Sequence, residues 1–167
     1  MSVQIEIANR EPTIVMSRVY DAPRALVWDA MTQPQHVQQW WGGPGFSSPR
    51  CEMDVRPGGL WDHVLRFPDG FELTMHFVFL DVQKPGRLVW QHVDHGTRKA
   101  GPPTCVTTVT LEDLGARTRW TMEARFGSMA DRQAARDMGF TGPIEASSER
   151  LVAYLPTVAN SVVAHDS

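Results

Sequence analysis

The chain has 167 residues, of which 42% are hydrophobic and 21% charged, and its formal net charge is −3. This composition is typical of one globular domain, and no apolar run approaches the ~20 residues that span a bilayer, so membrane insertion is not expected. The mild negative charge, without a block of Lys or Arg, argues against a nucleic acid as partner.

The beginning of the chain and its cysteines indicate the compartment. The stretch MSVQIEIANREPTIV has no basic segment followed by an apolar one, so we expect no secretory signal and a cytoplasmic location. Cys51 and Cys105 belong to no CxxC or Cys/His cluster, which predicts reduced cysteines. Residues 1–12 are treated as an N-terminal extension.

The first predicted elements are a strand and two short helices. TIVMSRVY, residues 13–20, alternates like a strand. Asp21 and Pro23 then mark the start of a helix, because both are favoured at helix N-termini. Pro34 interrupts this helix and allows a second short one that ends near Trp41.

Residues 46–126 have the pattern of consecutive strands. Pro-Gly and Asp-Gly turn signals follow one another at hairpin spacing and delimit about six strands, so we predict an antiparallel meander that gives seven strands with the first one. TRWTMEARF, residues 118–126, alternates most regularly, which indicates that one face of the sheet is exposed to water. In residues 71–80, the extra apolar residues indicate a bulge or a strand covered on both sides.

The rest of the chain is predicted to be helical. SMADRQAARDMGF, residues 128–140, indicates a short helix, and Gly142-Pro143 ends it and starts the last one. An apolar stripe follows at helical spacing, and Pro156 is expected to end the helix. Residues 13–156 are therefore predicted to form a single domain, and residues 157–167, which lack strong periodicity, a C-terminal tail for which disorder is one expectation.

A sheet that is wet on one face must cover the other, and the last helix is the only long element left to do so. The early helix pair would close one end. A curved sheet around one helix leaves a cleft between them.

The whole pattern resembles bacterial proteins of the activator of Hsp90 ATPase (AHSA1) family, within the START-like (SRPBCC) helix-grip superfamily. The resemblance runs from about Thr13 to Leu155 and rests on DAPRALVWDAMTQPQHVQQWWGGPGF, DVRPGGLWDHVLRFPDG, PGRLVWQH, ARTRWTM and ERLVAYL. It implies an α+β fold in which a curved seven-stranded antiparallel sheet wraps a long C-terminal helix, with two short helices after the first strand and an elongated apolar cavity. It also implies a bacterial protein connected with stress response.

Two departures from the family pattern matter. Related sequences often carry Gly-Trp near the start of the final helix, whereas here Gly139-Phe140 is followed by TGPIEAS, so we expect a differently shaped helical wall. The eukaryotic co-chaperones use a separate N-terminal domain to contact the chaperone, so contact with Hsp90 is not expected to follow from the shared fold.

The cavity wall is predicted from the phases of the strands and the last helix. The adjacent rings of Trp40 and Trp41 cannot face the same way, so we expect one to plug the core and the other to face the cavity mouth or solvent. The candidate ligand-binding residues are Trp41, Trp61, His63, Leu65, Phe67, Met75, Phe77, Trp90, Trp120, Met122, Ile144, Ser148 and Leu151. A fully packed core without a cavity remains the alternative.

Three histidines fall on successive predicted strands. The spacing of His63, His76 and His92 is that of hairpins and is no metal motif, so we predict no metal site and no cofactor. His63 and His92 share strand phases with Trp61 and Trp90, so each is either a hydrogen-bonded core group or a group that orients a ligand. If the protein is an enzyme, then His63, His92 and Ser148 are the catalytic candidates.

Three functions remain open. The leading hypothesis is a binding protein, with no covalent chemistry required, for a small hydrophobic or aromatic ligand such as a lipid or polyketide. The second is an aromatase/cyclase-like enzyme that folds a polyketide-type chain in a dry cavity. The third is a chaperone-related or other protein-interaction module, or a homodimer, which needs an exposed apolar patch around Trp40 and Trp41.

Overall fold

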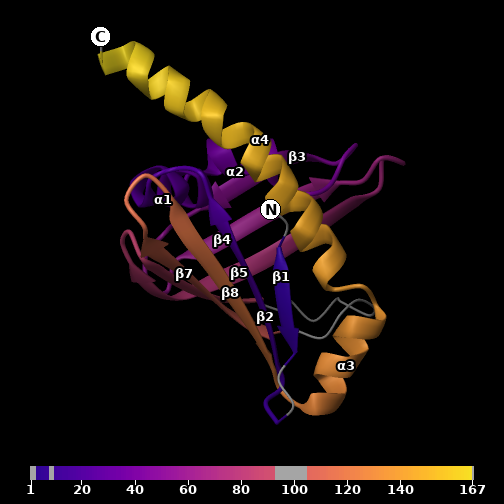
Figure 1. Ribbon diagram of the computed structural model, residues 1–167. Helices are drawn as coiled ribbons and strands as arrows, with labels where there is room; N and C mark the ends of the chain where they lie inside the picture. The colour runs from indigo at the N-terminus through magenta and orange to yellow at the C-terminus, as the bar shows by residue number, and fades with distance from the viewer. Residues whose placement is uncertain (1–2, 8–9, 93–104, 167) are drawn as a thin grey trace.

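The computed structural model describes residues 3–7, 10–92 and 105–166 of the chain, with side chains described up to residue 159 (Figure 1). Its strands are β1 (Gln4–Ile7), β2 (Thr13–Tyr20), β3 (Ser47–Met53), β4 (Leu60–Arg66), β5 (Glu72–Gln83), β6 (Arg87–His92), β7 (Cys105–Asp113) and β8 (Thr118–Phe126). Its helices are α1 (Arg24–Thr32), α2 (Pro34–Trp40), α3 (Met129–Asp137) and α4 (Thr141–Asp166).

All strands belong to one antiparallel sheet in the order β1-β2-β8-β7-β6-β5-β4-β3. Consecutive strands from β3 to β8 are antiparallel neighbours, which confirms the predicted meander, and the connection between β6 and β7 lies outside the described residues. The structure adds one strand to the predicted seven, because β1 lies in the N-terminal extension and pairs with β2. The α+β helix-grip fold is confirmed.

The alternation of β8 decides which face of the sheet is the core. Thr118, Trp120, Met122, Ala124 and Phe126 are all buried, whereas the residues between them are exposed or half-buried. The predicted phase is therefore confirmed. The irregularity expected in β5 is a bulge between Phe79 and Asp81, which turns Leu80 outward to 46% exposure.

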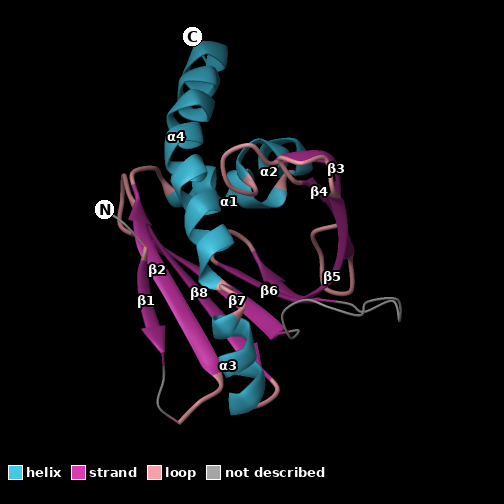
Figure 2. Ribbon diagram, turned by 90° about the vertical axis from the view of Figure 1, so that its right-hand side faces the viewer, coloured by secondary structure: helices cyan, strands magenta, loops and turns pink. Residues whose placement is uncertain are grey.

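Helix α4 crosses the concave face of the sheet, and its C-terminal half extends past the sheet (Figures 1 and 2). Helices α1 and α2 close one end of the fold and α3 lies at the other. The prediction that Pro156 ends the last helix is wrong, because α4 continues through Pro156 to Asp166. A proline inside a helix removes one backbone hydrogen bond and destabilises the helix without necessarily ending it.

The start of α4 also differs from the prediction. The helix begins at Thr141, before Gly142-Pro143, and α3 ends at Asp137. Gly139 takes a φ of +77°, a conformation that suits glycine at the end of a helix. The ring of Phe140 then packs edge-on against Phe126 at 5.4 Å between centroids, which anchors the junction to β8.

Candidate ligand-binding site

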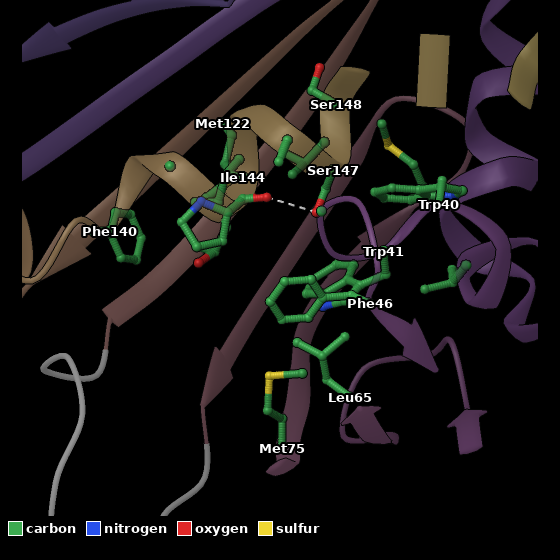
Figure 3. Close-up of a pocket in the computed structure, with 18 of the residues that line it drawn as sticks. Trp40, Trp41, Phe46, Leu65, Met75, Met122, Phe140, Ile144, Ser147 and Ser148 are labelled. Carbon is green, nitrogen blue, oxygen red and sulfur yellow. Dashed lines mark hydrogen bonds between the residues drawn. The ribbon is translucent and has the colours of Figure 1, made fainter. Parts of the chain in front are cut away.

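A cavity of about 640 Å³ lies between the concave face of the sheet and the first turns of α4. Strands β2 and β4–β8 line one side, and helices α1, α2 and α4 line the other, together with the loops after α2 and β4 and the segment between α3 and α4 (Figure 3). Leu73 and Met138 belong to the wall and are 38% and 55% exposed, so they mark where the cavity meets solvent. The packed core without a cavity, left open by the sequence, is therefore not what the structure has.

Most of the predicted ligand-binding residues lie together on this wall. All of them except His63 and Leu151 are wall residues: Trp41, Trp61, Leu65, Phe67, Met75, Phe77, Trp90, Trp120, Met122, Ile144 and Ser148. Leu151 lies on α4 and is fully buried in the core. That the wall residues contact a ligand stays a prediction.

Aromatic rings from neighbouring strands form the sheet side of the wall. The indole of Trp61 on β4 lies 4.7 Å from the ring of Phe77 and 5.4 Å from that of Trp90, between centroids. Its other neighbours are Phe79 at 6.0 Å, in a stacked arrangement, and Trp41 at 5.1 Å, edge-on. Because such pairs stabilise beyond the area they bury, this cluster makes a rigid apolar wall.

His63 is fully buried and is not among the wall residues. Its Nδ1 accepts a hydrogen bond from Trp61 Nε1 at 3.3 Å, so the proton lies on Nε2, which donates to Ser48 Oγ at 2.8 Å. Burial lowers the pKa of His63 from 6.5 to about 4, so the imidazole is neutral at pH 7. With both nitrogens engaged, His63 positions Trp61 and does not meet a ligand in this arrangement.

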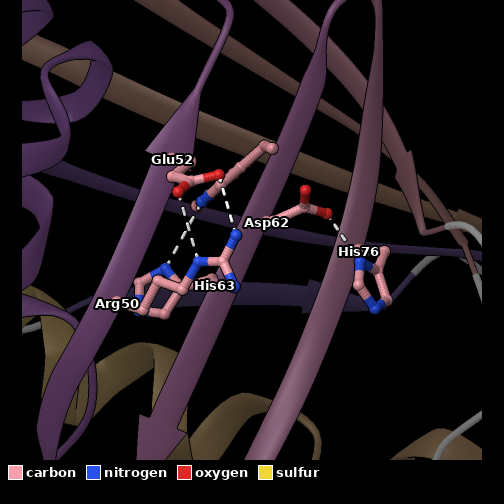
Figure 4. Close-up of polar contacts among 6 residues, drawn as sticks. Arg50, Glu52, Asp62, His63 and His76 are labelled. Carbon is pink, nitrogen blue, oxygen red and sulfur yellow. Dashed lines mark hydrogen bonds and ion pairs between the residues drawn. The ribbon is translucent and has the colours of Figure 1, made fainter.

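The other two histidines lie elsewhere. His92 is half-buried, is not a wall residue, and packs edge-on against Phe77 at 5.5 Å. His76 is on the outer face of β5, where Nδ1 lies 2.6 Å from Asp62 Oδ1 (Figure 4). Among the residues that the structure describes, no group of three or more His, Cys, Asp or Glu side chains could hold a metal ion.

The rings of Trp40 and Trp41 face different ways, as expected because two adjacent large rings cannot occupy the same space. Trp40 is 8% exposed, and its Nε1 donates to the Ala30 carbonyl at 2.9 Å, which joins α2 to α1. Trp41 is half-buried and its ring lies over His63 and Trp61 on the cavity wall. Neither ring is an exposed apolar side chain.

The loop after Trp41 is held by α4, through two residues that the sequence analysis missed. The two N–H groups of Arg150 Nη1 are shared among the carbonyls of residues 41, 42, 43 and 46 at 3.2–3.3 Å, and Nη2 donates to that of Gln39 at 2.9 Å. Ser147 Oγ accepts from Gly42 N and donates to the Pro143 carbonyl, both at 2.8 Å. Gly42 needs to be glycine, because its φ is +92° and an added Cβ would lie 2.8 Å from Phe46 Cβ.

One polar cluster touches the cavity, where β2 passes under α4. Tyr20 OH and Ser148 Oγ are 2.6 Å apart, and both residues are buried wall residues. Arg18 Nη1 donates to Ser148 Oγ and to Glu149 Oε1, each at 3.0 Å. Burial raises the pKa of Tyr20 to about 12, so its hydroxyl keeps its proton. The alternation of β2 places Arg18 and Tyr20 inward with Met16, a signal that the sequence already contained.

The curved antiparallel sheet around a long helix, with an apolar cavity between them, defines a START-like helix-grip protein. The family model of the Activator of Hsp90 ATPase homolog 1-like proteins matches residues 21–156, so the chain belongs to that family. No helix among the described residues is long and apolar enough to cross a membrane. A comparison with curated protein sequences gives no match.

Solved structures share the fold at low sequence identity. A protein from Arthrobacter aurescens is 24% identical, with a TM-score of 0.84 over 94% of this chain and 93% of that one. A protein from Nitrosomonas europaea is also 24% identical, with a TM-score of 0.81 over 92% and 99% of the two chains. One from Rhodobacter sphaeroides is 19% identical, with a TM-score of 0.83 over 94% and 99%. Identities this low support the fold alone.

Proposed function

We propose that this protein binds a small hydrophobic or aromatic molecule in the cavity between the sheet and α4. The observation that carries the proposal is a cavity of about 640 Å³ whose described wall is almost entirely aliphatic and aromatic. This volume falls within the roughly 300–1,000 Å³ of small-molecule sites, and flat aromatic walls favour flat apolar ligands. The helix-grip fold is consistent with such binding.

The positions of the candidate acid/base groups favour binding over catalysis. His63 has both ring nitrogens engaged and a pKa lowered by burial, and His92 is not a wall residue. Tyr20, with a pKa of about 12, does not act as a general base near neutral pH. In a cyclase-like enzyme, the remaining candidate groups on the wall would be hydroxyls that orient the substrate by donating hydrogen bonds.

The burial of the tryptophan pair favours binding over a docking role for that segment. An interaction module centred on Trp40 and Trp41 needs exposed rings, but Trp40 is buried and Trp41 is half-buried against Trp61. Both rings belong instead to the cavity wall.

Two measurements test the proposal. Native mass spectrometry beside the denatured sample should show a co-purified small molecule as a mass difference that disappears on denaturation. After ligand removal, titration with the neutral probe N-phenyl-1-naphthylamine should give saturable fluorescence enhancement at one probe per chain.

A matched pair of variants locates the binding. Val109 is a buried wall residue on β7 and Thr110, beside it, is exposed on the other face. Val109→Trp should fill the cavity and abolish probe binding, whereas Thr110→Trp should leave it intact. Unsaturable binding, or equal binding by folded Val109→Trp and Thr110→Trp, would contradict the proposal.

A further inference from the structure

Hydrogen bonds within the protein already engage several of the polar side-chain atoms of the cavity wall. Ser147 Oγ both accepts from Gly42 N and donates to the Pro143 carbonyl. Trp40 Nε1 and Trp61 Nε1 donate to Ala30 and His63. A ligand with a polar atom must therefore find its partner elsewhere on the wall, or leave that atom without one.

The pair of hydroxyls at Tyr20 and Ser148 has one proton to spare. Two O–H groups are present, and the single hydrogen bond of 2.6 Å between them uses one of the two protons, whichever group donates. Arg18 Nη1 is a donor to Ser148 Oγ, so it takes up a lone pair and no proton. Among the described residues, no acceptor takes the second proton, although Tyr20 and Ser148 are only 2% and 3% exposed.

This donor lies away from the mouth of the cavity. Ser148 is well separated from Leu65 and Met75 in the close-up view (Figure 3). Met75 lies on β5 two positions from Leu73, which is exposed at the rim of the cavity. Arg18 Nη1 donates a hydrogen bond to Ser148 Oγ at 3.0 Å, and this charged donor polarises the hydroxyl and strengthens it as a donor. The raised pKa of Tyr20 means that the donor persists across the physiological range of pH.

The charges around the pair favour a neutral acceptor over an anion. The side chain of Arg18 is 4% exposed and its charge is already compensated by Glu149, at 3.0 Å. A carboxylate buried here would meet the spare hydroxyl proton and a guanidinium whose charge is already paired with Glu149, which leaves most of its lost hydration unreplaced. A carbonyl oxygen needs only one donor, and the apolar remainder of the molecule suits the aromatic wall.

We propose that the cavity selects neutral apolar molecules with one carbonyl oxygen, which accepts the spare proton of the Tyr20–Ser148 pair. The inference rests on the proposed function, because it assigns a polar end to the ligand of the same cavity. The proposal predicts tighter binding of ketones or aldehydes than of hydrocarbons or carboxylates of the same shape.

The test uses three naphthalenes that differ at one position, each competing with N-phenyl-1-naphthylamine. 2-Acetylnaphthalene should bind about 3- to 10-fold more tightly than 2-isopropenylnaphthalene, in which a CH₂ group replaces the oxygen. 2-Naphthoate should bind more weakly than the ketone by about 10-fold or more.

Variants assign this preference to the pair. Each single variant, Tyr20→Phe or Ser148→Ala, retains one free hydroxyl proton and should keep part of the ketone preference. The double variant should bind ketone and hydrocarbon equally, with the hydrocarbon affinity little changed. Thr107→Val is the matched control, because Thr107 is a wall residue on β7 whose hydroxyl contacts only Cys105 Sγ, at 3.7 Å, among described side chains.

Each result has a distinct meaning. If the hydrocarbon binds but the ketone does not bind more tightly, or if 2-naphthoate binds best, the inference is overturned while the proposed function stands. If the preference disappears in Thr107→Val and survives in the double variant, the assigned donor is wrong. If none of the naphthalenes nor the fluorescent probe binds, the proposed function fails and the inference fails with it.

Discussion

The two sides of the cavity are held by different forces. On the sheet side, Trp61 packs against rings from β5, β6 and the loop after α2, and its Nε1 donates to His63. On the helix side, Ser147, Ser148 and Arg150 hold β2 and the loop after α2 through hydrogen bonds. One side is therefore shaped by packing and the other by hydrogen bonds.

This difference explains how a cavity persists beside α4. An apolar wall alone would gain by closing onto itself, because packing is favourable wherever apolar surfaces meet. Hydrogen bonds are directional, so the bonds from Arg150 to five backbone carbonyls set the distance between the loop and the helix. The hydrogen bonds on the helix side therefore keep the loop and α4 from closing onto the aromatic wall of the sheet.

The largest effect is expected from removing the central ring of the sheet side. Trp61→Ala should lower the free energy of unfolding by about 3–5 kcal/mol, because the ring is 2% exposed and its loss leaves a void among aromatic neighbours. Urea denaturation measures this change. Leu80→Ala, at the exposed bulge of β5, is the control and should cost less than about 1 kcal/mol. Equal losses would show that the ring cluster does not determine the stability of the wall.

The buried imidazole of His63, on the sheet side, should make stability depend on pH. The pKa of His63 falls from 6.5 in the unfolded chain to about 4 in the folded protein, so between these values the unfolded chain binds more protons. The contribution is complete above about pH 6.5, is lost as the pH falls toward 4, and amounts to about 3 kcal/mol in all.

The measurement is the free energy of unfolding of the wild type and of His63→Gln between pH 7.5 and 4. The two curves should converge as the pH falls. His76→Gln, on the wet face of the same hairpin, is the matched substitution and should leave the His63 contribution in place. Parallel curves for wild type and His63→Gln would mean that His63 is accessible to protons in the folded state.

The smallest of these effects concerns the helix side. Arg150→Gln removes the charged donors to the loop carbonyls and should cost about 1.5–3 kcal/mol. Amide hydrogen exchange should accelerate at residues 42–46 more than in β7 and β8. Arg50→Gln, at an exposed pair with Glu52 on β3, is the control. Unchanged exchange in the loop would show that Ser147 alone holds it.

Sequence patterns alone were enough to predict the sheet apart from β1, the helix pair and eleven of the residues of the cavity wall. Alternation in β8 and helical spacing from Ile144 onward are local properties, since side chains on opposite faces of a strand or helix meet different environments. The alternation of β2 is a local property of the same kind, and it turns Arg18 and Tyr20 inward.

What only the tertiary structure decided are the contacts between residues far apart in the chain. His63 shares its phase with Trp61, and yet Ser48, fifteen positions away, engages its second nitrogen and keeps it behind the wall. Arg150 reaches back more than one hundred positions to the loop after Trp41, and Ser148 meets Tyr20 across a similar span. Periodicity determines which way a side chain faces, whereas its partner depends on how the sheet curves and where α4 crosses it, and those follow from the packing of the whole molecule.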